Sequence, residues 1–588
     1  MATRNYDHTS PVEQLSSRTQ RPLEESSSLS SMPETSETSK FSNKAVSRPP
    51  KRGFQFWMII FSGCLVDVST ALDALIITTA LPKIVTVLHG ERDYVWLANT
   101  YVFACTAVMP FVGQVSNIFG RRMPMIVSVV FFTIGNAISG ASVNSSMLIA
   151  GRAVTGLGGG GIFVLNDLII SDLVPQRERA KFLGIRIAIA TMSTVIGPVI
   201  GGALAQNNWR WVFLINLPFS GVALLIMIPC LRLKYRREPT WARALARIDF
   251  LGNVIFIGSI CGVLFGLIMG GTQYHWSSWH IITPLVAGFA GWALFHVHQA
   301  SPICKEPSMP PALFRNRTSV AGLILAFCSN ILLEWIVYFL PIYFQSLKET
   351  TPLVSGVNVL PFSIFYVPLA VVTGGLMSKF GVFKPIHWVG FGFTSIANGL
   401  LSLLTEYSPK VEWILFQFVL AIGTGFTMIS ILPVIQAAVP ERLLATATST
   451  FAFVRNFGFV WGITLPPVIF NSQVDHRLNT ISDPKIAASM AAGGAYGFAG
   501  TGDVNHLPET VKQEVLRVYK ESLDAIWYAA AAVAAIAFVV VFLEKHIELK
   551  MDMDTEFGME EVRKECENER SNVSDKAVEL AERSKGTS

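Results

Sequence analysis

Charged residues are scarce in this sequence of 588 residues. Asp, Glu, Lys and Arg together make up 15% of it, against 51% for hydrophobic residues, and the mean hydropathy is +0.46. A soluble chain carries about 25% charged residues, so the apolar surplus indicates surfaces that face lipid. The net charge of +5 is modest, and the Lys and Arg residues fall between apolar runs. This pattern predicts a role in membrane topology rather than a nucleic-acid partner.

Cysteine is also rare, and its arrangement argues against two kinds of stabilising site. The seven cysteines are scattered, most of them in apolar runs, and none forms a C-x-x-C pair. A disulfide framework or a zinc centre is therefore not expected. His296 and His298 have a metal-like spacing, but the sequence shows no third ligand, so no metal and no cofactor is predicted.

Two motifs of energy use and catalysis are missing as well. The sequence contains no G-x-x-x-x-G-K-[ST] phosphate loop, because the glycine run Gly158–Gly161 is not followed by lysine. ATP is therefore not expected to be the direct energy source. The apolar segments also show no nucleophile–base constellation, so the chain is not expected to be an enzyme.

What the sequence does contain is a series of long apolar runs. At about 20 residues per membrane span, it predicts fourteen transmembrane helices, at residues 56–80, 94–115, 124–143, 147–170, 184–206, 211–231, 248–270, 279–299, 318–342, 353–377, 385–405, 411–435, 446–470 and 525–544. An even number places both termini on one side. Lys and Arg concentrate in the loops after spans 2, 4, 6 and 8, so the positive-inside rule places both termini in the cytoplasm.

An internal repeat divides these spans into two sets. GQVSNIFGRRMPMI follows span 2 and GGLMSKFGVFKPIH follows span 10, with the same spacing between the two glycines of each. The sequence therefore predicts an all-α polytopic membrane protein whose parts are a disordered N-terminal tail (1–53), a six-helix half (54–231), a linker with inserted helices 7 and 8 (232–317), a second six-helix half (318–545) and a C-terminal tail (546–588).

The segment 471–524 is predicted to be an outer loop between spans 13 and 14. Its second part has Val511, Val515, Tyr519 and Leu523 at helical spacing. This spacing predicts a short amphipathic helix at the membrane surface. The sequon that begins at Asn144 is a glycosylation candidate on the same side, in a short loop.

Four of the charged residues inside the predicted spans have a candidate role in transport. Arg152 costs about 2.5–3.5 kcal/mol in a central position, so it is expected to face a cavity or a partner. Asp73 is a candidate for a charge that changes during a cycle, or else a helix-end residue near the headgroups. Asp67 is a candidate for the substrate or proton path, or for a bond to a neighbouring helix. Glu334 could select cationic substrates or carry a proton, or extend to the interface.

Four short motifs stand in order along the chain. They are LDALIITTALP (Leu72–Pro82), GQVSNIFGRR (Gly113–Arg122), GRAVTG (Gly151–Gly156) and GPVIGG (Gly197–Gly202). Over roughly residues 55–545 the sequence resembles the major facilitator superfamily and, within it, the fourteen-helix drug:proton antiporters of the fungal toxin or multidrug efflux type. It departs from the family pattern at Asn117 and Ile118, where an Asp followed by an Arg is usual, at Thr155, where Gln is usual, and at Ser193.

The resemblance implies a role for each motif. Asp73 and Arg152 would couple transport to protons, and Asp67 and Glu334 are candidates for the substrate cavity. Gly113, Asn117, Gly120, Arg121 and Arg122 form the loop motif. Asp172 is expected to pair with Arg121 or Arg122 as a gate, with Arg455 as the counterpart in the second half. Gly197, Pro198, Gly201 and Gly202 form the antiporter motif.

The function implied is proton-coupled export of toxic organic compounds or secondary metabolites by alternating access, with the chain as a monomer in the plasma membrane. Its partners would be a small organic substrate, protons and the lipid bilayer. Two alternatives stay open. One is an uptake or vacuolar carrier for siderophores or basic amino acids, which would suit Asp67, Asp73 and Glu334. The other is a transporter-like membrane sensor that signals through its tails.

Overall fold

The computed structural model describes residues 53–88, 93–233, 240–271, 273–501, 504, 507–547 and 549. These residues form α-helices and short 3-10 turns, with an isolated β-bridge between Gly270 and Tyr274. The all-α prediction is therefore confirmed. The predicted tails at 1–53 and 546–588 lie almost entirely outside the described residues.

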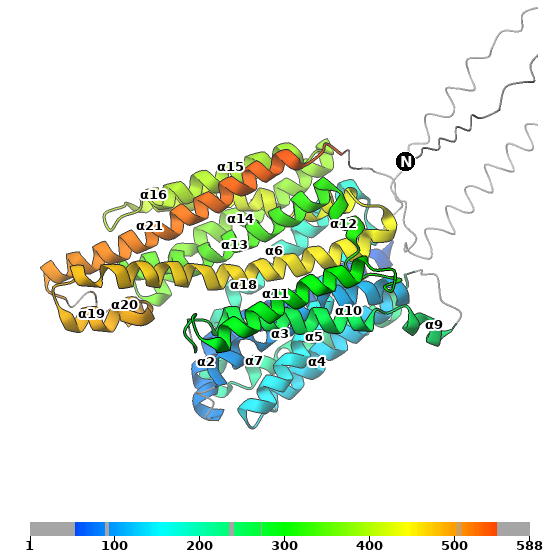
Figure 1. The fold of residues 1–588 in the computed structure, drawn as a ribbon, viewed down its shortest axis with the longest axis horizontal. Coiled ribbons are helices and arrows are strands. Elements are labelled where there is room, and N and C mark those ends of the chain that lie inside the picture. The colour runs from blue at the N-terminus through cyan, green and yellow to red at the C-terminus, as the bar shows by residue number, and fades with distance from the viewer. Residues whose placement is uncertain are drawn as a thin grey trace, which may run out of the picture. The chain divides into compact units, whose positions relative to one another are not determined.

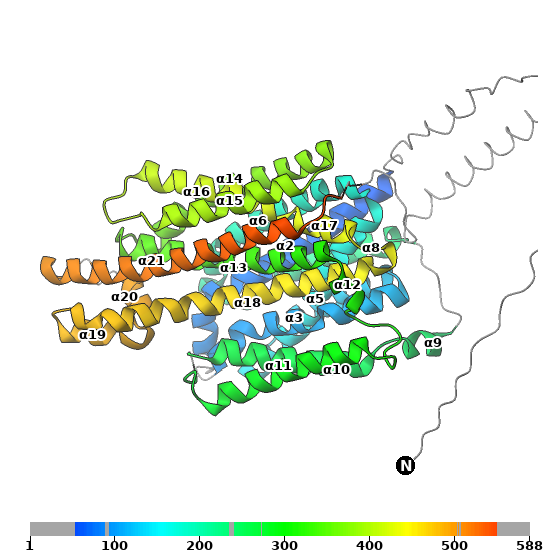
Figure 2. The ribbon, with the colours of Figure 1, turned by 45° about the horizontal axis from the view of Figure 1, so that its top comes forward.

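The described helices fall into two groups joined by a helical hairpin (Figures 1 and 2). The N-terminal helix group contains α2 (Phe54–Leu88), α3 (Tyr94–Phe119), α4 (Arg122–Gly140), α5 (Ser145–Leu173), α6 (Gln176–Asn208), α7 (Trp211–Leu214) and α8 (Asn216–Cys230). The C-terminal helix group contains α13 (Arg317–Ser346), α14 (Pro352–Phe380), α15 (Lys384–Leu401), α16 (Lys410–Met428), α17 (Ile431–Ala437), α18 (Leu444–Arg477), α19 (Pro484–Met490), α20 (Ala495–Thr501) and α21 (Glu509–Val540).

Four helices connect the two groups: α9 (Trp241–Ala246), α10 (Phe250–Met269), α11 (Trp279–Ala300) and α12 (Pro311–Arg315). The pair α10 and α11 forms a hairpin that packs against α3 and α18, as Figure 2 shows. Aromatic contacts contribute to this packing. The ring centres of Phe256 in α10 and Phe453 in α18 are 5.0 Å apart, and those of Trp292 in α11 and Phe457 in α18 are 5.6 Å apart. The hairpin therefore contacts both helix groups.

Twelve described helical segments are long and apolar enough to cross a membrane. The predicted spans 184–206 and 385–405 fall on α6 and α15, which are helical but do not reach that apolarity, so the count of fourteen is not confirmed. Both helices pack between other helices: α6 lies between α2 and α14, and α15 lies between α16 and α21. A helix surrounded by protein needs a less continuous apolar surface than one that faces lipid.

The sequence repeat corresponds to a repeated structural feature. Gly120 and Gly381 end α3 and α14 with φ values of 76° and 68°, a conformation that glycine adopts without strain. Seven residues earlier, Gly113 and Gly374 leave no room for a side chain, because a Cβ atom would overlap Ser449 of α18 and the carbonyl oxygen of Ala180 in α6, respectively. In each case the missing side chain lets one helix group approach the other.

The predicted outer loop 471–524 is mostly helical. Helix α18 continues to Arg477, and α21 already begins at Glu509, so the predicted amphipathic helix forms the first turns of the last span. Val515, Tyr519 and Leu523 are buried in the C-terminal helix group rather than laid on a membrane surface. Ion pairs connect this part, since Glu521 contacts Arg477 at 2.5 Å and Arg517 at 2.9 Å.

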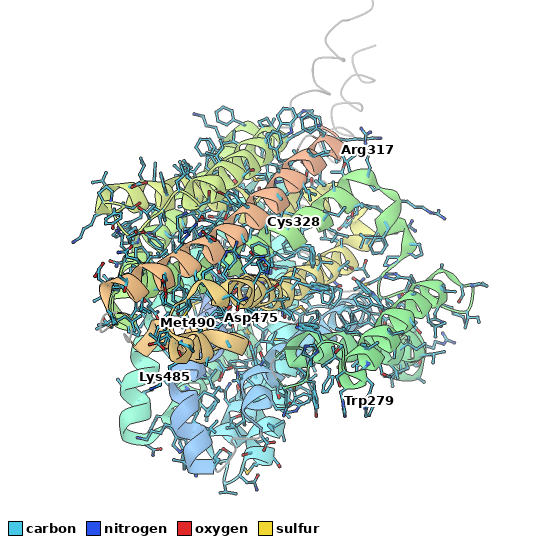
Figure 3. All side chains as sticks on the ribbon, turned by 60° about the vertical axis from the view of Figure 1, so that its left-hand side comes forward. Trp279, Arg317, Cys328, Asp475, Lys485 and Met490 are labelled. Atoms are coloured by element: carbon cyan, nitrogen blue, oxygen red, sulfur yellow. The ribbon has the colours of Figure 1, made fainter. Side chains whose placement is uncertain are left out.

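Two ends of the helical bundle are distinguished by their loops. Figure 3 shows Arg317 at one end and Lys485 at the other. The end with Arg317 also carries the loops around Arg121 and Arg177, and we call it the basic end. The end with Lys485, α19 and α20 is called the opposite end.

Candidate functional site

A buried ion pair links helices α2 and α5. Arg152 Nη1 of α5 lies 2.6 Å from Asp73 Oδ2 of α2, and the two side chains are 1% and 0% exposed. Asn216 Nδ2 of α8 donates a hydrogen bond of 3.2 Å to Asp73 Oδ1. The ring of Tyr101 lies 4.8 Å from the guanidinium carbon of Arg152. Three helices and an aromatic face thus hold one positive and one negative charge away from solvent.

A second charge cluster lies in the same helix group and contains two residues that the sequence analysis missed. Arg186 of α6 pairs with Asp67 of α2 at 3.1 Å and also with Asp167 of α5. Asn166 donates a hydrogen bond of 2.9 Å to Asp67. All four side chains are buried. Arg186 and Asp167 are charged residues within apolar runs, the same signal that identified Arg152, so the sequence did contain the information to find them.

The two arginines of the loop motif, Arg121 and Arg122, bind different partners. Arg121 Nε pairs with Asp172 Oδ2 at 2.9 Å, and its Nη1 donates to the carbonyl oxygen of Ser116 and to Asn117 Oδ1. Arg122 donates instead to the carbonyl oxygen of Ile228. Because Arg121 and Asp172 both belong to the N-terminal helix group, this ion pair ties α3 and α4 to α5 and does not connect the two groups.

The connection between the groups at the basic end uses other residues. Gln436 of α17 exchanges hydrogen bonds with Ser171 of α5 and accepts one of 3.1 Å from Arg179 Nη1 of α6. Arg177 donates to the carbonyl oxygens of Ser378 and Lys379 at the end of α14. Nearer the middle, Asn456 Nδ2 of α18 donates to Thr106 Oγ1 of α3 at 3.3 Å. These bonds run from the basic end to about half the depth of the bundle.

Glu334 and Arg455 lie in the C-terminal helix group and contact no opposite charge among the residues that the structure describes. Glu334 of α13 is 7% exposed and makes no hydrogen bond or ion pair with a described residue. It packs against α18 at Gly462, where an added Cβ atom would lie 2.7 Å from the Cβ of Glu334. Arg455 lies in the first half of α18, and its guanidinium carbon is 5.5 Å from the centre of the Phe451 ring.

Two further candidates have simple structural surroundings. Helix α6 is continuous through the antiporter motif, and Gly197 and Gly201 are buried. The surroundings of Pro198 and Gly202 lie outside what the structure describes. Asn144 is the N-cap of α5, and its side chain accepts a hydrogen bond of 2.8 Å from the backbone N–H of Met147. The amide that a glycan would modify is thus already part of a helix cap.

The structure gives His298 the neighbours that the sequence did not show. Ligand atoms of Asp249, His298 and Cys304 lie within 4.8 Å of one another at the basic end, a set that could hold a metal ion. Both carboxylate oxygens of Asp249 are already occupied, by the N–H of Gly252, His298, Gln299 and the Cys304 thiol. Burial and the hydrogen bond to Asp249 raise the pKa of Cys304 to about 12, which disfavours the thiolate that binds metals.

Asp249 is expected to stabilise the hairpin in a pH-dependent way. Burial alone would raise its pKa, but the hydrogen bonds from His298 and Gly252 outweigh it and hold the pKa below its usual value. A lowered pKa gives stability that is full above the unfolded value of about 3.9 and is lost as the pH falls through the folded value. We expect Asp249→Ala to cost about 1 kcal/mol near neutral pH, because it removes an N-cap.

Thermal unfolding of the purified protein at neutral pH and near the pKa of an unfolded aspartate would test this. The difference between the variant and the original chain should narrow at the lower pH. Glu306→Gln, which changes a half-exposed acid of the following loop that pairs with Arg247, is the matched control. An equal difference at both pH values would show that the ionised carboxylate of Asp249 contributes nothing.

Comparisons with known proteins agree with this architecture. The family model described as Major Facilitator Superfamily matches residues 61–463 of this chain. The chain is 46% identical over 510 residues to the MFS efflux transporter aclA of Aspergillus oryzae, covering 87% of this chain and 92% of that one. It is 38% identical over 523 residues to the efflux pump FUS6 of Gibberella fujikuroi, covering 88% and 94%. A crystal structure of XylE double-tryptophan mutants shares the fold, with a TM-score of 0.52 and 14% identity over 84% of this chain and 97% of that one.

Proposed function

Because the chain belongs to the major facilitator superfamily, a family of multi-pass membrane transporters, we propose that it exports small organic compounds of the toxin or secondary-metabolite kind in exchange for protons. The relatives named as efflux pumps support the direction of transport. The candidate site supplies acids and arginines inside the bundle, and a secondary transporter needs such groups to bind a proton away from bulk water.

The observation that carries the proposal is the buried pair of Asp73 and Arg152. A carboxylate and a guanidinium at 2.6 Å form a unit whose charge changes by one when Asp73 takes up a proton. The proton removes the attraction that holds Arg152 on α5 to α2. We assign proton coupling to this pair, and a supporting role to Asp67 with Arg186, which connects α2 to α6.

Alternating access would use the contacts at the basic end. The hydrogen bonds of Gln436 and Arg177 join the two helix groups there, so the described arrangement corresponds to a state closed at the basic end. We place the basic end in the cytoplasm, following the positive-inside rule. Each hydrogen bond contributes about 0.5–1.5 kcal/mol net, so breaking this small set is within reach of substrate and proton binding.

A direct test is export from cells that produce the chain. We expect a panel of dyes and fungal toxins to leave these cells faster than cells with an empty vector, and a proton uncoupler to abolish the difference. Glu514→Gln is a suitable control, because Glu514 lies on the opposite end and contacts the exposed Ser482. Export that continues at full rate with the uncoupler would contradict proton coupling. Accumulation of a cation or a siderophore inside the cells would favour uptake instead. If no compound of the panel is exported, the proposed efflux function is rejected.

A further inference from the structure

Two polar groups of the C-terminal helix group are unused by the proposed mechanism. Among the described residues, neither the guanidinium of Arg455 nor the hydroxyl of Tyr366 makes a hydrogen bond or an ion pair. Arg455 of α18 is partly exposed and Tyr366 of α14 is 4% exposed. The two lie within electrostatic range of each other. Unused donors inside a protein carry a desolvation cost, so a ligand that accepts hydrogen bonds would be favoured there.

Arg455 differs in this respect from the buried arginines of the bundle. Arg121 and Arg152 each contact a carboxylate of their own helix group. The carboxylates of Asp67 and Asp167, which interact electrostatically with Arg455, are both in contact with Arg186.

The charged and titratable groups in range of Arg455 come from four other helices: Asp67 on α2, Asp167 on α5, Arg186 on α6 and Tyr366 on α14. Because both carboxylates are paired with Arg186, the guanidinium of Arg455 has no bound acceptor among the described residues. Arginine presents its N–H groups in a planar arrangement that suits a carboxylate.

Two aromatic rings lie near this guanidinium. The ring of Phe163 on α5 lies 5.9 Å from the guanidinium carbon of Arg455, and the ring of Phe451 on α18 lies 5.5 Å from it. Tyr366 is stacked on Phe362 at 5.7 Å, with an interplanar angle of 18°. Flat apolar surfaces next to one positive group suit a ligand with a conjugated body and an acidic oxygen.

We propose that Arg455 and Tyr366 bind the carboxylate or enolate oxygen of an organic acid whose aromatic or conjugated body packs against Phe163 and Phe451. This inference rests on the proposed function and names the substrate class of the same transporter. Because Phe163 belongs to the N-terminal helix group and the other three residues to the C-terminal group, the bound acid would bridge the two groups. Separation of the groups would then weaken its binding.

The test uses three naphthalene compounds with closely matched bodies: naphthylacetate, naphthylacetamide and naphthylethylamine. They present a negative, a neutral and a positive group. Binding to the purified full chain is measured by ligand-dependent thermal stabilisation. We expect naphthylacetate to bind about tenfold more tightly than naphthylacetamide, as one charge-assisted hydrogen bond allows.

Four variants locate the effect. Arg455→Gln should remove the preference for the acid while naphthylacetamide still binds, which also shows that the variant is folded. Arg455→Lys should keep part of the preference, since it keeps the charge. Tyr366→Phe should weaken the binding of naphthylacetate several-fold. Arg517→Gln, which changes an exposed arginine of α21, should have no effect.

Each other outcome contradicts the proposal. Absent binding of naphthylacetate, equal binding of the acid and the amide, or a preference that survives Arg455→Gln would overturn it. Tighter binding of naphthylethylamine would instead assign the site to a cation, with Glu334 as the group to examine. Failure of the efflux assay together with an intact preference that depends on Arg455 would reject export and retain the anion site, so the two proposals fail separately.

Discussion

Asp73→Asn is expected to abolish export and to lower the unfolding temperature of the purified protein. The substitution leaves Arg152 buried with its charge uncompensated, at 1% exposure and with no other carboxylate in contact among the described residues. Removing one partner of a buried ion pair costs about 3–5 kcal/mol. The loss of export has a second cause, because asparagine cannot take up and release a proton.

A double variant separates these two causes. Asp73→Asn with Arg152→Gln removes both charges, so we expect it to recover much of the lost stability but none of the export. Glu521→Gln is the control for a weak ion pair, because Glu521 contacts Arg477 and Arg517 at the opposite end, where exposed pairs contribute about 0–1 kcal/mol. If the double variant is less stable than Asp73→Asn, the unpaired charge of Arg152 is not the cause of the lost stability. Normal export by either variant would exclude Asp73 as the proton carrier.

Gly158→Ala is expected to destabilise the N-terminal helix group severely. The added Cβ atom would overlap the backbone nitrogen of Phe132 and lie 2.5 Å from the carbonyl oxygen of Ser128, so α4 and α5 would have to move apart. Overpacking a close contact costs about 1–3 kcal/mol, and a rigid backbone neighbour places this site at the upper end. Folded yield and thermal unfolding in detergent would measure the loss.

The matched control is Gly258→Ala in α10. A Cβ atom added there meets nothing within 4 Å, and alanine is the better helix former. We therefore expect Gly258→Ala to leave the unfolding temperature unchanged or slightly higher. Equal effects of the two substitutions would mean that the glycines of α5 reflect composition and not close packing.

The predictions from sequence were accurate where one residue or one run decides the outcome. Long apolar runs indicated the spans, since a helix that faces lipid must be apolar along its length. The rule weakened for α6 and α15, which protein surrounds, and for residues 471–524. There the hydrophobic spacing of Val515, Tyr519 and Leu523 showed a helix but could not show that it continues into α21.

The sequence indicated individual charged residues of the candidate site but not which of them pair. A charge in an apolar run indicated Arg152 and Asp73, and the same reasoning applies to Arg186 and Asp167. Which acid meets which arginine depends on helix packing, which spacing along the chain does not determine. Gln436 carries no charge and sits in a short helix, so nothing in the sequence indicated that it joins the two helix groups.

The close contact of α5 with its neighbours also bears on how such a chain can diversify. Where a Cβ atom added to a glycine of α5 would overlap backbone atoms of α3 or α4, a substitution would cost the fold before it changed the ligand. Phe451 and Arg455 on α18 lie outside that contact, and their side chains can be exchanged without forcing two backbones apart. New ligand preferences in descendants of this sequence should therefore arise on the α18 side, while the α5 side stays nearly constant.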